Sequence, residues 1–301
     1  MKKLFSIVFI ISLLIICVSC KKKENNEVLI KKENNIPKKL IEILNTVDKI
    51  ETEILKLKIE VKKTDEDKIE EDKKEIMKKL KEEDSDKEKE DEGGKKEENG
   101  KEKSQSQDKL KSIKTKDEKI KDLWTNLEKE VESIHMIFSD YKTTAIKDKA
   151  NEEKIKQFEE NLNSLTIFIA NKDLLNGFIL NNDIYENISY FTSLYTDYES
   201  EVIKLKFYVN QVYIYGLKDE WDSTLEGIEQ IETKYSEIYK IFDKKLKEKE
   251  KPTEDDKKKE KDLEILDVSI HSLKQSLNKK DIRLLEIKKD VVISNLEKLK
   301  D

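Results

Sequence analysis

Large apolar side chains recur three and four residues apart along much of the chain, the spacing that places them on one face of an α-helix. The sharpest run has seven members: Leu40, Ile43, Val47, Ile50, Ile54, Leu57 and Val61. Their alternating spacings match the heptads of a coiled coil. The pattern continues more weakly to Leu80. We therefore predict a helix over residues 38–81 that either packs on the rest of the protein or projects from it as a stalk.

Residues 110–301 contain further runs of this kind. They predict helices near residues 113–141, 155–169, 174–178, 184–212, 221–246 and 263–299. Asn171–Asp173 and Asn181–Asp183 have the composition of caps for the helices that follow, and Gly216 is expected to end one. A charged gap at 247–262 precedes the last helix. Strand-like alternation never lasts more than a few residues. The predicted fold class is all-α, an elongated helical bundle of five or six amphipathic helices.

Two segments lack the apolar positions that a packed helix needs. Residues 20–37 are rich in Lys and Asn, and residues 82–109 have no large apolar side chain. The whole chain is 43% charged, with only 6 Gly and 2 Pro. Because such segments bury too little apolar surface to offset the entropy of ordering, we predict a flexible tether and a disordered charged linker.

The N-terminus has the pattern of a secretion signal. Two lysines precede the apolar run Leu4–Cys17, which is short for a membrane span of roughly 20 residues. Val18, Ser19 and Cys20 then resemble a lipobox, with small residues before a cysteine. We predict that residues 1–19 are removed and that Cys20 is acylated and anchors the chain to membrane lipid. The alternatives are an ordinary secretory signal and an uncleaved anchor.

Charge and candidate chemistry narrow the function. The net charge is −6, Lys and Glu are interleaved, and Arg283 is the only arginine, which argues against nucleic acid as a partner. The two histidines, His135 and His271, have no further ligands at metal-binding spacing. No Gly-rich phosphate loop or nucleophile motif is present. We therefore expect no catalytic residues, no metal and no cofactor, and we do not expect an enzyme.

Aromatic residues concentrate in one region. Seven of the 10 tyrosines lie between residues 185 and 215. Tyr195 and Tyr198 fall on the apolar face of the predicted helix and belong to the core. Six aromatics lie off that face: Tyr185, Tyr190, Phe207, Tyr208, Tyr213 and Tyr215. They indicate either a central helix buried on several sides or a partner-binding face, since tyrosine is favoured at protein interfaces.

The chain resembles surface lipoproteins of Lyme-disease spirochaetes (Borrelia) in its Lys-Lys signal ending in Ser-Cys, its Lys/Asn tether and its lysine-rich helical body. Within the body, Ile137–Tyr141, Asn151–Lys156 and Leu162 are similar to the first body helices of the virulent-strain-associated lipoprotein family. That resemblance implies a helical fold at the cell surface. It also implies a host partner, because several members bind complement factors, plasminogen or matrix components.

Two functional hypotheses follow. In the first, the chain is a lipid-anchored protein of the outer membrane, exposed at the surface, that binds a host serum or matrix protein as an adhesin or immune-evasion factor. In the second, it is a structural or periplasmic lipoprotein that self-associates through the heptads of residues 38–61, because three heptads need a partner helix. Exposure of the protein to protease on intact cells separates the two.

Overall fold

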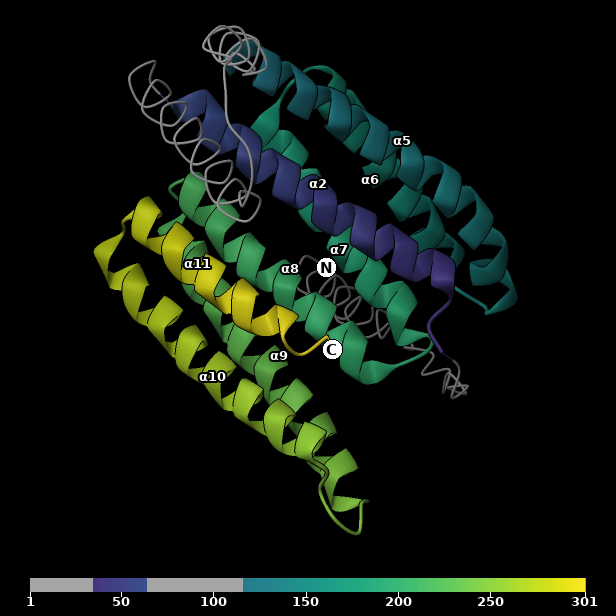
Figure 1. Ribbon diagram of the computed structural model, residues 1–301, viewed down its shortest axis with the longest axis vertical. Helices are drawn as coiled ribbons and strands as arrows, with labels where there is room; N and C mark the ends of the chain where they lie inside the picture. Colours follow the sequence, from purple (N-terminus) through teal and green to yellow (C-terminus); the bar gives the residue numbers. More distant parts are fainter. Residues whose placement is uncertain (1–34, 64–115, 301) are drawn as a thin grey trace, which may run out of the picture. The chain divides into compact units, whose positions relative to one another are not determined.

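The computed structural model describes residues 35–63 and 116–300, and in these ranges it contains α-helices, one short 3₁₀ turn and no strand, which confirms the all-α fold class (Figure 1). The helices are α2 (Lys38–Lys62), α5 (Lys116–Lys147), α6 (Glu152–Ala170), α7 (Leu174–Ser193), α8 (Asp197–Leu217), α9 (Trp221–Lys247), α10 (Glu254–Ser276) and α11 (Ile282–Glu297). The predicted signal peptide at 1–19, Cys20, most of the predicted tether, residues 64–81 and the predicted linker at 82–109 lie outside the described residues. No helix in the described ranges is long and apolar enough to cross a bilayer.

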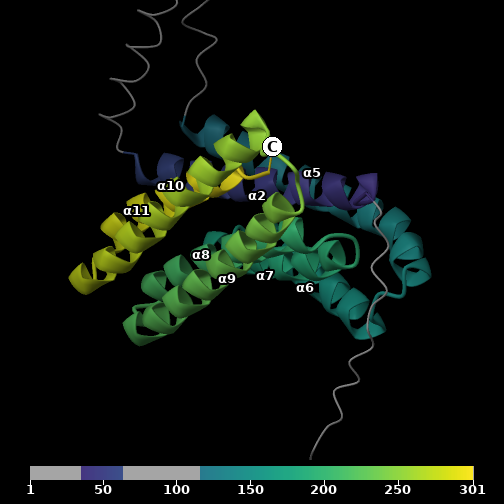
Figure 2. The ribbon, with the colours of Figure 1, turned by 90° about the horizontal axis from the view of Figure 1, so that it is seen from below.

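The helices form two layers (Figure 2). In one layer α6, α7, α8 and α9 pack side by side in chain order. The other layer holds the pairs α5 with α2 and α11 with α10, and each of these helices packs on a member of the first layer: α5 on α6, α2 on α7, α11 on α8 and α10 on α9. The backbones of α2 and α11 make at most marginal contact with each other. The space between them is bridged by side chains.

Helix α2 docks on the bundle, which decides between the two arrangements that the sequence left open. Six of its seven heptad positions, from Leu40 to Leu57, are at most 2% exposed, and they pack toward α5 and α7. Val61, the seventh, is 53% exposed. The helix ends at Lys62, and Lys63 has extended backbone. Lys116 Nζ, from the start of α5, donates to the Lys63 carbonyl oxygen at 2.7 Å and so holds the two helix ends together.

The region of the predicted helix at 184–212 differs from the prediction. Asn181–Asp183 do not cap a helix, because α7 runs through them from Leu174 to Ser193. The Asn182 side chain instead donates to the Phe207 carbonyl oxygen of α8, at 3.2 Å. The break comes at 194–196, where Thr196 and Glu199 have the Ser/Thr-x-x-Glu spacing of a capping box and their side chains are in contact. One predicted helix is therefore the end of α7 plus α8.

The last predicted helix is also two helices, and the charged gap is shorter than expected. Thr253 and Asp256 form a complete capping box, so α10 begins at Glu254, inside the predicted gap of 247–262. A 3₁₀ turn and Lys280, in the left-handed conformation, end that helix. Asp281 then caps α11 by accepting from the Leu284 N–H. Both corrections come from caps made by short polar side chains rather than by glycine.

Candidate functional site: a buried charge network

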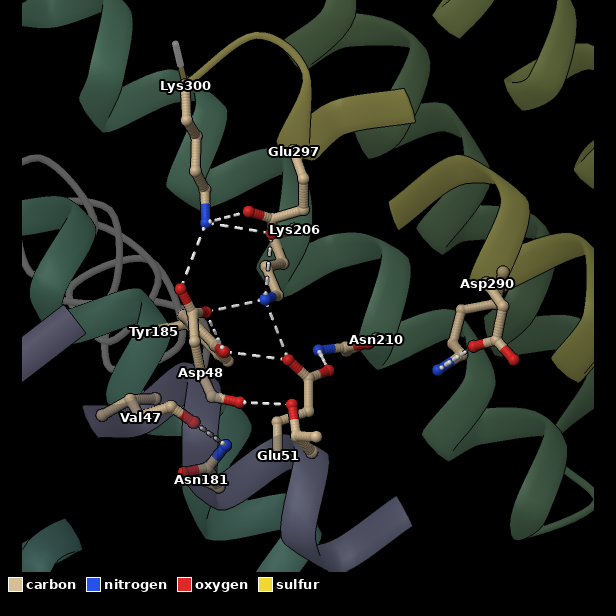
Figure 3. A network of polar contacts seen from close by, with 12 residues as sticks. Val47, Asp48, Glu51, Asn181, Tyr185, Lys206, Asn210, Asp290, Glu297 and Lys300 are labelled. Carbon is tan, nitrogen blue, oxygen red and sulfur yellow. Dashed lines mark hydrogen bonds and ion pairs between the residues drawn. The ribbon is translucent and has the colours of Figure 1, made fainter. Parts of the chain in front are cut away.

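A network of charged and polar side chains fills the space between α2 and α11, above α7 and α8 (Figure 3). We call this set the interhelix network: Asp48 and Glu51 of α2, Tyr185 of α7, Lys206 and Asn210 of α8, and Glu297 and Lys300 at the C-terminal end. It connects α2 near the start of the described chain to α7, α8 and the C-terminal helix α11.

Lys206 is the centre of the interhelix network. Its ammonium lies 2.7 Å from Asp48 Oδ1, 2.9 Å from Glu51 Oε2 and 3.2 Å from Glu297 Oε1, so three carboxylates surround one cation. The side chain is 5% exposed. Helix α8 places it there because α8 is covered by α7, α9 and α11, which leaves little of its circumference for solvent. A buried ammonium needs such partners, because removing it from water is costly.

Neutral donors complete the coordination of the two α2 carboxylates. The Tyr185 hydroxyl lies 2.6 Å from Asp48 Oδ1 and 2.8 Å from Glu51 Oε2, and its single proton is shared between them. Asn210 Nδ2 donates to the other Glu51 oxygen at 2.7 Å. At the rim, Lys300 Nζ lies 3.3 Å from Asp48 Oδ2 and 2.7 Å from Glu297 Oε2. Both oxygens of Glu51 therefore have partners although the residue is 5% exposed.

The electrostatics favour the ordinary charge states of Lys206, Asp48 and Glu51. Burial alone would lower the pKa of Lys206, but the charges of Glu51, Asp48 and Glu297 outweigh it and raise that pKa. Burial likewise opposes ionisation of Asp48 and Glu51. The charge of Lys206, a second lysine (Lys300 at Asp48, Lys289 at Glu51) and the hydrogen bonds together outweigh it, so the pKa of both carboxyl groups is lowered. Burial and the two carboxylates raise the pKa of Tyr185. A nucleophilic lysine or a general acid needs a pKa shifted toward neutrality, and these shifts run the other way.

A second cluster extends the same polar layer along α2, α8 and α11. Two ammonium groups lie near the Tyr213 ring, with Lys58 Nζ 4.9 Å and Lys289 Nζ 5.1 Å from its centroid. Lys58 also pairs with Glu286, and Lys289 Nζ lies 2.7 Å from Asp290 Oδ1. Lys289 lies on the core-facing side of α11 and is 1% exposed although it is a lysine. The contact between α2 and α11 is thus made by ion pairs and cation–π contacts.

The six off-face aromatics do not form an exposed partner-binding surface, which corrects that interpretation. Tyr185 and Tyr213 are at most 1% exposed and belong to the two polar clusters, and Phe207 is also buried. Tyr190, Tyr208 and Tyr215 are half-buried. The reason is the central position of α7 and α8, each covered on several sides. The six aromatics instead fit the other interpretation, a central helix buried on several sides. Tyr195 and Tyr198 lie in the core as predicted.

Neither histidine is placed near further metal ligands. His135 Nε2 lies 2.8 Å from Thr166 Oγ1, and burial lowers the pKa of the ring. His271 Nε2 lies 2.9 Å from the Gln275 side chain on the same helix. Within residues 35–63 and 116–300, no group of three or more His, Cys, Asp or Glu side chains is arranged to hold a metal ion.

Sequence reasoning missed the interhelix network. Asp48 and Glu51 look like any other acidic residues in a chain that is 43% charged. One signal was available: α8 carries apolar or aromatic residues around most of its circumference, which is typical of a buried helix. A lysine within such a helix is buried and needs an acidic partner, although the sequence does not reveal which one.

Comparison of the chain with protein-family models, with curated proteins and with solved structures finds no significant match.

Proposed function

We propose that the chain is a lipid-anchored bacterial surface protein that binds a host protein without catalysing a reaction. The observation that carries the proposal is the N-terminal sequence, in which the apolar run Leu4–Cys17 leads to Val18-Ser19-Cys20. The resemblance to spirochaetal surface lipoproteins supports the outer membrane as the location and a serum or matrix protein as the ligand.

The interhelix network supports a non-catalytic role. Its charged groups are paired with one another, and their pKa shifts favour the ordinary charge states. Catalytic acids and bases instead combine a cleft with a pKa matched to the working pH. The network is suited to fixing the relative positions of α2, α7, α8 and α11, as a rigid binding scaffold requires.

The structure removes the main reason for proposing self-association through residues 38–61. That hypothesis requires an unpartnered heptad face, yet Leu40, Ile43 and Val47 and the next three members are buried inside the chain's own bundle. The absolute mass of the purified chain, measured by light scattering over a range of concentrations, tests the remaining possibility. A dimer that Val61→Lys, at the exposed seventh heptad position, abolishes without unfolding the chain would restore the hypothesis.

Lipidation is tested by labelling cells with radioactive palmitate. We expect label on the wild type and on Cys17→Ala, and none on Cys20→Ala. Cys17→Ala is the matched control, because it removes the neighbouring cysteine and leaves the acceptor in place. Equal labelling of Cys20→Ala and the wild type would contradict the anchor at Cys20.

Surface exposure and binding need separate measurements. Protease added to intact cells should remove this protein and spare a periplasmic control, and survival until lysis would contradict surface display. Immobilised mature chain is then tested for binding of purified serum and matrix proteins. Because the six aromatics are largely buried, the site should be mapped with exposed side chains such as Met136 and Val268, which are 67% and 70% exposed. Absence of binding across that set would contradict the host-protein proposal.

A further inference from the structure

Helices α10 and α11 form an antiparallel hairpin that carries exposed apolar side chains on both helices (Figure 1). Ile265 and Val268 of α10 are 37% and 70% exposed, and Ile287 and Val291 of α11 are 51% and 46% exposed. All four lie between 8 and 14 positions from Lys279, the end of the turn that joins the helices. Because residues at similar distances from the turn of a hairpin lie at the same level, the two helices present these side chains next to each other.

Helical periodicity places two of the four on the outer surface of the hairpin. Val268 follows Leu266 by two positions, and Ile287 follows Leu285 by two positions. Leu266 and Leu285 are at most 1% exposed and point into the bundle. Two positions turn an α-helix by slightly more than half a turn, so Val268 and Ile287 point away from the bundle.

The other two lean toward the groove between the helices. Lys274 forms an ion pair with α9 and so marks the α9 side of α10. Ile265 lies nine positions before it, which is two and a half turns, and therefore faces the α11 side. Glu286 pairs with α2 and marks the α2 side of α11. Val291 lies five positions further on, which turns it toward α10.

Charged side chains of both signs border this apolar group without ion pairs. Glu264 and Asp267 are exposed on α10, and Asp267 lies seven positions before Lys274, which places it at the α9 edge. Arg283, the only arginine of the chain, is exposed one turn before Ile287 on α11. Within residues 35–63 and 116–300, no ion pair involves Glu264, Asp267 or Arg283. Arginine is enriched at protein interfaces, where its planar fork binds carboxylates.

Exposed apolar residues near the start of α2 and the end of α5 have a different setting. Ile41 is 41% exposed, but the charges beside it are paired, with Lys39 Nζ 2.9 Å from Glu42 Oε2. Ile146 is 57% exposed, but the nearby Asp148 accepts from a tyrosine hydroxyl at 2.6 Å. The carboxylates at that end are thus satisfied within the chain, whereas those beside Val268 are not.

We propose that the outer face of α10 and α11 is the interface of a homodimer, in which it packs against the same face of a second copy. In a two-fold dimer every contact is made twice, so a face that carries both charges can satisfy itself. A two-fold axis that crosses the hairpin obliquely lays the acidic edge of one copy, Glu264 and Asp267, over Arg283 of the other copy, and the reverse. The apolar side chains of both copies then meet at the centre.

The size of the face sets the strength of the association. Helix α11 has 16 residues and is about 24 Å long, and two packed helices are about 20 Å wide. The face therefore offers about 500 Å² per copy, below the roughly 800 Å² of a standard interface. We expect a concentration-dependent dimer with a dissociation constant of about 10–100 μM.

Sedimentation equilibrium of the chain that starts at Lys21 tests the dimer, because this chain contains every described helix and carries no acyl group. Ile287→Lys should keep it monomeric at all concentrations. Val61→Lys is the matched control, since Val61 is 53% exposed on α2, and it should leave the dimer intact. A wild-type chain that stays monomeric up to about 1 mM would overturn the proposal, since a specific interface of this size should associate there. A dimer that survives Ile287→Lys, or that Val61→Lys abolishes, would overturn it as well.

Charge reversal tests the pairing across the interface. Glu264→Arg and Arg283→Glu each bring like charges together, so each should weaken the dimer at least about 10-fold. The double variant restores opposite charges and should recover most of the affinity. Single variants without effect, or a double variant no better than either, would overturn the arrangement. Unchanged urea midpoints show that the fold is intact, and neither acylation nor host binding enters the measurement.

Discussion

The ammonium of Lys206 lies 2.9 Å from Glu51 Oε2, and both side chains are at most 7% exposed. The pair joins α8 to α2, which are neither adjacent in sequence nor packed through a shared apolar face. A buried ion pair of this kind contributes little to net stability compared with an apolar pair, but loss of one partner leaves an uncompensated charge. Its main effect is to specify which helices meet.

Replacement of Lys206 by methionine should therefore be severe. Lys206→Met keeps most of the side-chain volume but leaves Glu51 and Asp48 without their shared cation. We expect the free energy of unfolding in urea to fall by about 3–5 kcal/mol. Adding Glu51→Gln should restore part of the loss, because the amide keeps hydrogen-bonding capacity without the charge.

The matched control breaks an exposed pair. Lys274 Nζ lies 2.8 Å from Glu232 Oε1, and the two side chains are 48% and 41% exposed. Lys274→Met should cost less than about 1 kcal/mol, because solvent screens the pair. Equal losses for Lys206→Met and Lys274→Met would show that the interhelix network has no special structural role.

Asp183 introduces a pH dependence of the opposite kind from a paired carboxylate. It lies on α7, where burial, and secondarily the charge of Glu186, raise its pKa from 3.8 to about 6. The folded state therefore holds a proton that the unfolded state has lost, and stability decreases as pH rises from about 4 to about 6. Above that range the charged carboxylate remains a constant penalty.

Asp183→Asn should remove this penalty. At pH 7.5 we expect the variant to be more stable by about 1 kcal/mol, an allowance for solvent screening of a partly buried group, and near pH 4 we expect no difference. Urea unfolding at both pH values measures the effect. A gain for Asp183→Asn that is equal at both pH values would rule out titration as its cause.

The apolar periodicity predicted which segments form helices better than it predicted where those helices end. Leu40 to Leu57 are buried as their spacing indicates, because one side of α2 faces the core. The breaks at Thr196 and Lys280 were missed, since the apolar spacing continues through both and neither contains Gly or Pro. Helix ends depend on a few capping bonds, which contribute about 1 kcal/mol each and leave a weak sequence signal.

The candidate site was not predictable for a different reason. The sequence indicates that the off-face tyrosines are unusual but not where they point: Tyr185 points toward Asp48 and Glu51 rather than to solvent. A pattern with a period of seven identifies one buried face. It does not identify helices such as α7 and α8 that are covered on several faces by neighbours distant in sequence.

Left-handed residues at the helix ends offer a test of local strain. Lys172, in the α6–α7 turn, has a positive φ of 58°. Its N–H donates to the Ile169 carbonyl oxygen at 2.9 Å. Glycine adopts this conformation without steric cost, so Lys172→Gly should stabilise the chain by about 0.5–1 kcal/mol. Lys156→Gly, in the second turn of α6 with the side chain 76% exposed, should instead destabilise it by about 1 kcal/mol. Thermal unfolding of both variants measures the difference, and a loss for Lys172→Gly would contradict the strain.

Two glycines at helix contacts, Gly227 and Gly177, should respond differently to replacement by alanine. A Cβ at Gly227 of α9 would lie 2.6 Å from Val212 Cγ2 and 3.9 Å from the Val212 Cα, so α8 and α9 meet there almost backbone to backbone. Valine is stiff in a helix and has little freedom to turn aside. We expect Gly227→Ala to cost about 1–3 kcal/mol in urea unfolding, despite the higher helix propensity of alanine.

A Cβ at Gly177 of α7 meets only the flexible end of Ile169, at 2.9 Å. Gly177→Ala should therefore be near neutral, because rotation of Ile169 relieves the contact while the helix gains about 1 kcal/mol of propensity. Equal costs for the two variants would mean that α8 and α9 can separate as easily as one isoleucine can turn.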